Sequence, residues 1–153
     1  MIPSFLPEEI VTAESTRSAR LKWVIIVDKT APVGRMVNAV ACISAATGDM
    51  VDGLIARGGP DADGVAHPGL PWAGCSVLTA GAEQLANVRR KAADIESILV
   101  VDMPESAQAN RIYDEYLAEL STTRTTDVAA IALSMIGPRA EIDAIVKRLS
   151  LLA

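Results

Sequence analysis

The sequence contains few of the residues that usually carry metal or redox chemistry. Its 153 residues include one histidine, two cysteines, two tryptophans, two tyrosines and one phenylalanine. The two cysteines, Cys42 and Cys75, are far apart and form no Cys-x-x-Cys pair, so together with one histidine they offer too few ligands for a zinc site. We therefore predict reduced thiols, and neither a metal ion nor a cofactor.

Positive charge and long apolar runs are also scarce. Fourteen lysines and arginines stand against 19 aspartates and glutamates, which gives a formal net charge of −5. Proteins that bind nucleic acid usually present a basic surface to the phosphates, so a nucleic-acid partner is not expected. No apolar run is long enough to cross a membrane and no signal-peptide pattern opens the chain, so we expect a cytoplasmic protein without membrane association.

The stretch 22–48 organises the rest of the chain and predicts a buried strand, a turn and a helix. Residues 23–27 are apolar without alternation, as in a central strand that is covered on both faces. Pro32 cannot continue the strand, so the chain must turn there. A helix is predicted over 33–47, with Gly48 just past its end.

Three further pairs of a strand and a helix follow this unit. Strands are predicted at 75–80, 98–101 and 128–136, followed by helices at 82–95, 102–120 and from 137 onward. The Gly- and Pro-rich segment 57–71 is typical of a long loop. The alternation predicts an α/β protein, a three-layer α/β/α sandwich around a mixed, mainly parallel sheet of about four strands. We expect a single domain over residues 1–153, in which 1–21 form an N-terminal arm or helix and 22–152 form the sandwich.

Several short motifs together resemble a known family. The apolar strand from Lys22, the pair Gly34-Arg35 that opens an alanine-rich helix, and the closing segment MIGPRAEIDAIVKRLSLL are similar to parts of type-2 peptidyl-tRNA hydrolases. The middle segment, DADGVAHPG followed by CSVLTA, resembles an uncharacterised bacterial family, domain of unknown function 2000, which shares that fold. The resemblance spans residues 22–152 and implies the type-2 peptidyl-tRNA hydrolase-like fold.

The resemblance also assigns positions to the hydrolase site. The glycine–lysine pair of the hydrolases corresponds to Gly34 and Arg35, while Ala39 and Cys42 stand where those enzymes have a glutamine and a histidine. Arginine keeps the positive charge of the lysine but replaces its compact ammonium group with a planar guanidinium that can donate two parallel hydrogen bonds. The related hydrolases form homodimers, and the first helix is apolar nearly all round, so we expect a homodimer.

The residues themselves predict an anion site at the turn into the first helix. A helix N-terminus exposes backbone N–H groups that attract anions, and cationic and polar side chains gather near this turn in an acidic protein. The predicted ligand-binding residues are Lys22, Asp28, Lys29, Gly34, Arg35 and Asn38, with Arg124 or His67 reaching over them. The alternative is that Arg35 and Asn38 only solvate the start of the helix.

His67 and Asp127 are the candidates for catalysis. A carboxylate from Asp61 or Asp63 in the same loop would orient the imidazole of His67 as a general acid or base; alternatively, this histidine only caps a surface turn. The two aspartates lack the spacing of a calcium loop. Cys42 lies within an apolar helix, where a cysteine is more often a small core residue than a nucleophile.

Two functions therefore stand beside each other. The first is a cytoplasmic protein that binds a small anionic ligand at the first strand-to-helix turn. The alternative is a hydrolase of peptidyl-tRNA or a related ester, in which Arg35 holds the substrate and His67 or Asp127 steers the water.

Overall fold

A five-stranded mixed sheet forms the centre of the computed structural model, which describes residues 1–153. Its strands, in the spatial order β5-β6-β1-β4-β7, are β1 (Leu21–Asp28), β4 (Cys75–Ala80), β5 (Leu99–Pro104), β6 (Ala130–Pro138) and β7 (Ser150–Leu151). The helices are α1 (Val33–Met50), α2 (Ala82–Ala93), α3 (Glu105–Ala109), α4 (Tyr113–Thr122) and α5 (Arg139–Val146). None of these helices combines the length and the apolar character that a membrane span requires.

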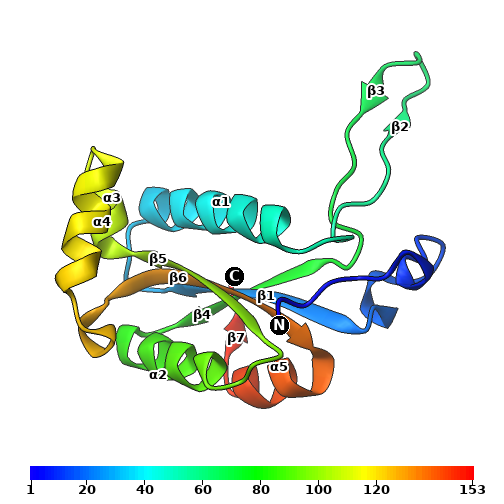
Figure 1. Ribbon diagram of the computed structural model, residues 1–153. Coiled ribbons are helices and arrows are strands. Elements are labelled where there is room, and N and C mark those ends of the chain that lie inside the picture. Colours follow the sequence, from blue (N-terminus) through cyan, green and yellow to red (C-terminus); the bar gives the residue numbers. More distant parts are fainter.

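The sheet is covered by α1 on one face and by α2 and α5 on the other (Figure 1). Successive side chains of β1 alternate between the two faces, so that Trp23 and Ile25 pack in the core under α1. Val24 and Ile26 pack in the second core, with α2 and α5. Both sets are almost completely buried, which is why the strand is apolar without alternation.

The sheet is mixed, as predicted, but most of its strand pairs are antiparallel. Only β1 and β4 are parallel neighbours, whereas the pairs β1–β6, β5–β6 and β4–β7 are antiparallel. The prediction of a mainly parallel sheet is therefore wrong. Pro104 at the end of β5 pairs with Ala130 at the start of β6, so α3 and α4 return the chain to the same end of the sheet without crossing a face. An alternating order of strands and helices does not distinguish such a return from a crossover.

Two predicted helix boundaries are also corrected. Helix α1 continues through Gly48 to Met50, so this glycine lies inside the helix. The helix predicted over 102–120 is divided into α3 and α4, because Asn110 takes an extended conformation and donates its side-chain amide to the carbonyl oxygen of Ser106. Asp102, the first residue of the predicted helix, is a residue of β5.

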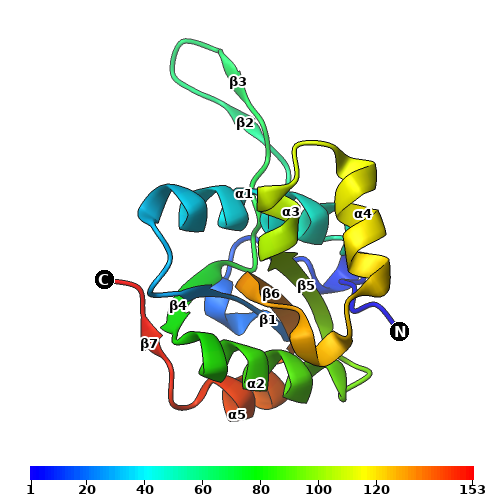
Figure 2. The same ribbon diagram turned by 90° about the vertical axis from the view of Figure 1, so that its left-hand side faces the viewer.

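The segment predicted as a long loop forms a projecting β-hairpin. Residues 57–70, here called the hairpin arm, contain the short antiparallel strands β2 (Gly59–Pro60) and β3 (Ala66–His67). The arm stands away from the body on the side of α1 (Figures 1 and 2). Residues 57–68 are all exposed to solvent.

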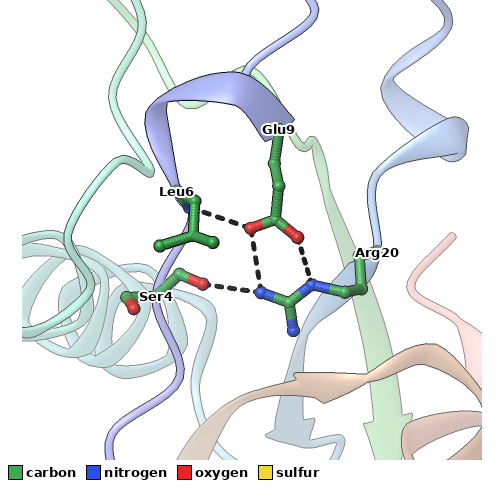
Figure 3. A network of polar contacts seen from close by, with 4 residues as sticks. All are labelled: Ser4, Leu6, Glu9 and Arg20. Atoms are coloured by element: carbon green, nitrogen blue, oxygen red, sulfur yellow. Dashed lines mark hydrogen bonds and ion pairs between the residues drawn. The ribbon is translucent and has the colours of Figure 1, made fainter.

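The N-terminal segment packs on the body through Phe5, whose backbone N–H also donates to the carbonyl oxygen of Asp52, and an internal ion pair holds the segment together. It contains two 3₁₀ turns, Pro7–Glu9 and Thr16–Ser18, and no α-helix. Phe5 is buried against Trp72, with ring centroids 4.9 Å apart. Arg20 donates to the Glu9 carboxylate through Nε and a terminal nitrogen, which also donates to the carbonyl oxygen of Ser4 (Figure 3).

Candidate functional site

The main cleft of the molecule lies between α1, the end of β5, α3 and α4. Its volume is about 780 Å³, and α3 stands beside α1 above the end of β5 (Figure 2). Apolar side chains of α1, β5 and α3 line it, among them Ile43, Ala46, Val101, Met103 and Ala107. The charged and polar residues that line it are Arg35, Asn38, Cys42, Asp102, Gln108, Tyr113 and Tyr116.

Gln108 of α3 joins the two helices that border the cleft. Its amide nitrogen Nε2 donates to the carbonyl oxygen of Arg35 at 3.0 Å and to Oδ1 of Asn38 at 2.9 Å. Its amide oxygen Oε1 accepts a hydrogen bond from Nε of Arg35 at 3.0 Å. One half-buried glutamine therefore fixes the orientation of both polar side chains that α1 directs toward the cleft.

Arg35 is held in place by this contact but keeps most of its donors free. Only its Nε is bonded, and no carboxylate forms an ion pair with its guanidinium. The side chain stands in the first turn of α1, which starts after Pro32 without a side-chain cap. The free backbone N–H groups of that turn and the guanidinium together create a positive end of the cleft. A planar fork of this kind binds carboxylates and phosphates through two parallel hydrogen bonds.

The two tyrosines of the chain border the opposite side of the cleft. Tyr113 and Tyr116, on α4, form an edge-to-face pair with centroids 5.5 Å apart, and the side chain of Tyr113 is 72% exposed. Burial, followed by the negative charge of Asp102 and the neighbouring Tyr113, raises the pKa of Tyr116. Tyr116 is therefore a neutral hydroxyl donor at physiological pH rather than a base.

Asp102 brings little net negative charge to the cleft, because Arg89 of α2 donates to its carboxylate. Both side chains of this pair are three-quarters buried. The charge of the aspartate is thus neutralised from the face of the sheet that α2 covers. The electrostatic character of the cleft is set by Arg35 instead.

The structure brings together three of the predicted ligand-binding residues. Gly34, Arg35 and Asn38 all line the cleft. Asp28 and Lys29 lie at the carboxyl end of β1, outside the cleft, where Asp28 accepts hydrogen bonds from the backbone and hydroxyl of Thr30 and so stabilises the turn.

Lys22 does not belong to this site, contrary to the prediction. It lies at the amino end of β1, and Asp28 at the carboxyl end, six residues further along an extended strand. Its ammonium group forms an ion pair with Asp143 of α5. A strand of eight residues separates its ends by far more than a hydrogen bond, so Lys22 and the turn before α1 cannot share one small ligand.

Arg124, Asp127 and His67 are also separate from the cleft. Arg124 and Asp127 lie on the connection from α4 to β6, where Asp127 lines a different cavity of about 160 Å³. His67 lies in the hairpin arm, with its Nε2 at 3.2 Å from Oδ2 of Asp61. This contact and hydrogen bonds from backbone N–H groups of the arm lower the pKa of Asp61. The predicted convergence of His67 or Arg124 on the helix start is therefore wrong.

Sequence reasoning missed Gln108, Tyr113 and Tyr116 as residues of the site. Both tyrosines fall within the single helix predicted over 102–120, and the division of that segment into α3 and α4 places them at the cleft. The available signal was that the only two tyrosines of the chain stand three residues apart, on one side of one helix. For Gln108 no sequence signal existed, because its partners lie 70 and 73 residues away.

Comparison with known proteins gives one matching family and a similar solved structure. The family model described as "Protein of unknown function (DUF2000)" matches residues 21–153. A protein of unknown function from Agrobacterium tumefaciens strain C58, Atu0240, is 18% identical, with a TM-score of 0.75 over 88% of this chain and 98% of that one. At this identity the likeness shows a shared fold. No curated protein matches the chain.

Proposed function

The chain belongs to the family described as protein of unknown function (DUF2000), a description that names no activity. From the cleft alone, we propose that the protein binds a small organic anion there. The acidic group of the ligand lies against Arg35 and the first turn of α1. Its apolar part lies against the floor formed by α1 and β5. The site is the strand-to-helix turn and the cleft that extends from it.

The observation that carries this proposal is the state of Arg35. Its Nε is fixed by Gln108 while its terminal amino groups have no partner, although they border a cleft of about 780 Å³. Because the bond at Nε already fixes the orientation of the guanidinium, less entropy is lost when its terminal amino groups bind a ligand. The apolar lining favours a ligand with a hydrocarbon or aromatic body over a bare inorganic anion.

Calorimetric titration with N-acetyl-leucine, a carboxylate with an apolar body, tests this proposal. A charge-assisted hydrogen bond contributes about 1.5–3 kcal/mol, so Arg35→Gln should weaken binding by roughly tenfold or more. Arg17→Gln, which changes an exposed arginine of the N-terminal segment, is the matched control and should bind as the unchanged protein does. Absence of binding by the unchanged protein, or equal affinity in Arg35→Gln, would contradict the proposal.

A hydrolase of peptidyl-tRNA or a related ester is the second candidate. Gly34, Arg35 and Cys42 line one cleft, at the positions that correspond to the glycine, lysine and histidine of type-2 peptidyl-tRNA hydrolases. We infer from this order of motifs that the fold is related to that of those enzymes. The proposed water-steering residues His67 and Asp127 lie elsewhere, and the carboxylate that lines the cleft, Asp102, is paired with Arg89.

Turnover of peptidyl-tRNA by the purified protein decides between the two candidates. Hydrolysis that is lost in Arg35→Gln but kept in His67→Ala and Asp127→Ala would establish the hydrolase with its chemistry in the cleft. No turnover, together with binding of N-acetyl-leucine, leaves ligand binding as the function.

A further inference from the structure

The outer edge of β5 has no partner in the molecule. β5 is the last strand of the sheet on its side, and neither view shows a strand beside its outer edge (Figures 1 and 2). Apart from its pairing with β6, none of residues 99–103 takes part in a backbone hydrogen bond. Such an edge is a template on which another extended chain can form hydrogen bonds.

The register of the sheet identifies the backbone groups that point outward. The N–H of Lys29 donates to the carbonyl oxygen of Ala80 in β4. Backbone groups alternate along a strand, so every second residue back from Lys29 directs its N–H and C=O toward β4. The residues between them, including Ile26, direct theirs toward β6. Ile26 is paired with Leu133, and alternation along β6 then turns Ser134 toward Val101 of β5. The two neighbours of Val101 consequently direct their N–H and C=O groups away from the sheet. They are Val100 and Asp102.

The cleft reaches this edge. Four consecutive residues of β5, from Val101 to Pro104, line it. Successive side chains of a strand point to opposite faces, so a cavity that meets four in a row must approach the strand from its edge. The free guanidinium of Arg35 lies in the same cleft, beside α3, which directly follows the carboxyl end of β5.

From these observations we infer that the ligand of the cleft is an extended peptide with a free C-terminal carboxylate. The peptide adds to β5 as a parallel strand, forms hydrogen bonds with the N–H and C=O groups of Val100 and Asp102, and places its carboxylate on Arg35. Parallel orientation follows because the chain of β5 runs toward α3 and Arg35. The main-chain bonds supply affinity with little dependence on sequence, and the carboxylate fixes the register. This inference rests on the proposed binding of an organic anion and specifies its class.

A comparison of two ligands tests the inference separately from the proposed function. N-acetyl-leucine reaches Arg35 and the apolar floor of the cleft but not the outward backbone groups of Val100 and Asp102, whereas N-acetyl-Val-Thr-Val-Thr-Leu with a free carboxylate also covers the edge of β5. The added main-chain hydrogen bonds should make the pentapeptide bind at least tenfold more tightly in calorimetric titration. Its C-terminal amide should lose most of the affinity, as should the pentapeptide with the variant Arg35→Gln.

A backbone variant examines the edge itself. Val100→Pro removes an outward N–H without removing a bond of the sheet, which an edge strand tolerates. It should reduce the affinity for the pentapeptide about fivefold and leave that for N-acetyl-leucine unchanged; Val100→Ala, which keeps the N–H, is the control. If Val100→Pro does not fold, two N-methylated pentapeptides replace it. One is methylated on the backbone nitrogens that face β5 and the other on those that face away, and only the first should bind more weakly.

The outcomes separate the two claims. If N-acetyl-leucine binds and the pentapeptide binds no more tightly, the peptide inference is overturned and the proposed function stands. If neither ligand binds, both are overturned. If Val100→Pro converts a dimer to a monomer in sedimentation without any peptide, the edge pairs two copies of the chain and the peptide inference is wrong.

Discussion

At the scale of single residues, Arg35 differs from the basic residues that form ion pairs, and among the arginines held only by uncharged acceptors, which include Arg90 and Arg139, it is the one that lines the cleft. Arg20, Lys22 and Arg89 each have a carboxylate partner: Glu9, Asp143 and Asp102, respectively. Arg35 is equally ordered, because Gln108 holds its Nε, but its partner is an uncharged amide. An ordered cation without a counter-charge at the border of a cleft is an arrangement suited to binding an anion.

The ion pair of Glu9 with Arg20 makes stability depend on pH in the acidic range. Hydrogen bonds from the Arg20 side chain and then from the Leu6 backbone lower the pKa of Glu9 from 4.5 to about 2. A carboxyl whose pKa is lower in the folded state stabilises the fold above its unfolded pKa of 4.5, and this contribution is lost as the pH falls toward 2.

We therefore expect Glu9→Gln to flatten the acid side of the stability profile. Urea unfolding at pH values from about 6 to 3 should show a smaller loss of the free energy of unfolding for the variant than for the unchanged protein. Glu14→Gln, which alters an exposed glutamate that forms no ion pair, serves as the control. Parallel profiles for Glu9→Gln and the unchanged protein would show that the pair does not persist in solution.

At the scale of secondary-structure elements, a buried polar chain connects α1 to the sheet. The indole Nε1 of Trp23 in β1 donates to the hydroxyl of Ser134 in β6 at 2.8 Å. That hydroxyl lies 2.7 Å from the hydroxyl of Thr47 in α1, which also bonds the carbonyl oxygen of Ile43. Ser134 and Thr47 are almost fully buried, so their bonds have no water to replace them.

Removing the middle of this chain should be costly. Ser134→Ala leaves the buried indole N–H of Trp23 without an acceptor, and we expect a loss of about 1–3 kcal/mol in the free energy of unfolding, measured in urea. Ser121→Ala, at an exposed serine of α4 whose hydroxyl bonds only the local backbone, should change it by less than about 0.5 kcal/mol. A loss at Ser134 no larger than that at Ser121 would mean that the indole finds another partner.

The sequence predicts some elements better than others. Elements whose sequence pattern lies within the element itself are predicted, and boundaries that depend on individual side-chain hydrogen bonds are not. The strand 75–80 and the helix beginning at Ala82 match because their signals, a short apolar run and a 3.6-residue stripe, are contained within the element. The division between α3 and α4 was not predictable by pattern. It depends on Asn110, whose side chain bonds both Ser106 and Glu119 across the break.

At the scale of the whole molecule, long-range pairing was the part that could not be predicted. The sequence indicates that β1 is central, but not that β6, more than 100 residues later, is its antiparallel neighbour. The candidate site shows the same limit. Gly34, Arg35 and Asn38 were predicted from a local signal at a helix start, while the cleft exists only because α3 and the edge of β5 meet that helix.

The hairpin arm is the part of the molecule most independent of this arrangement. Its neck is narrow: a Cβ on Gly69 would lie 1.7 Å from the carbonyl oxygen of Ala56, so glycine is required for the two strands to approach. Beyond the neck the residues are exposed and contribute nothing to either core. The arm also carries His67, the one histidine, in β3, where its Nε2 contacts the carboxylate of Asp61.

Removing the arm should therefore leave both the fold and the cleft intact. Replacing residues 59–68 with Asn-Gly, a sequence that forms a tight hairpin turn, is expected to keep Tm within about 2 °C, because no buried surface is lost. The affinity for N-acetyl-leucine should stay within about twofold of the unchanged protein, since binding depends on Arg35, Asn38 and the floor of the cleft. Gly69→Ala in the full chain is the informative comparison, because it strains the neck without removing His67. A fall in affinity on deletion of the arm, restored when only His67 is retained in a shortened hairpin, would show that the histidine reaches the ligand after all and would return the arm to the site.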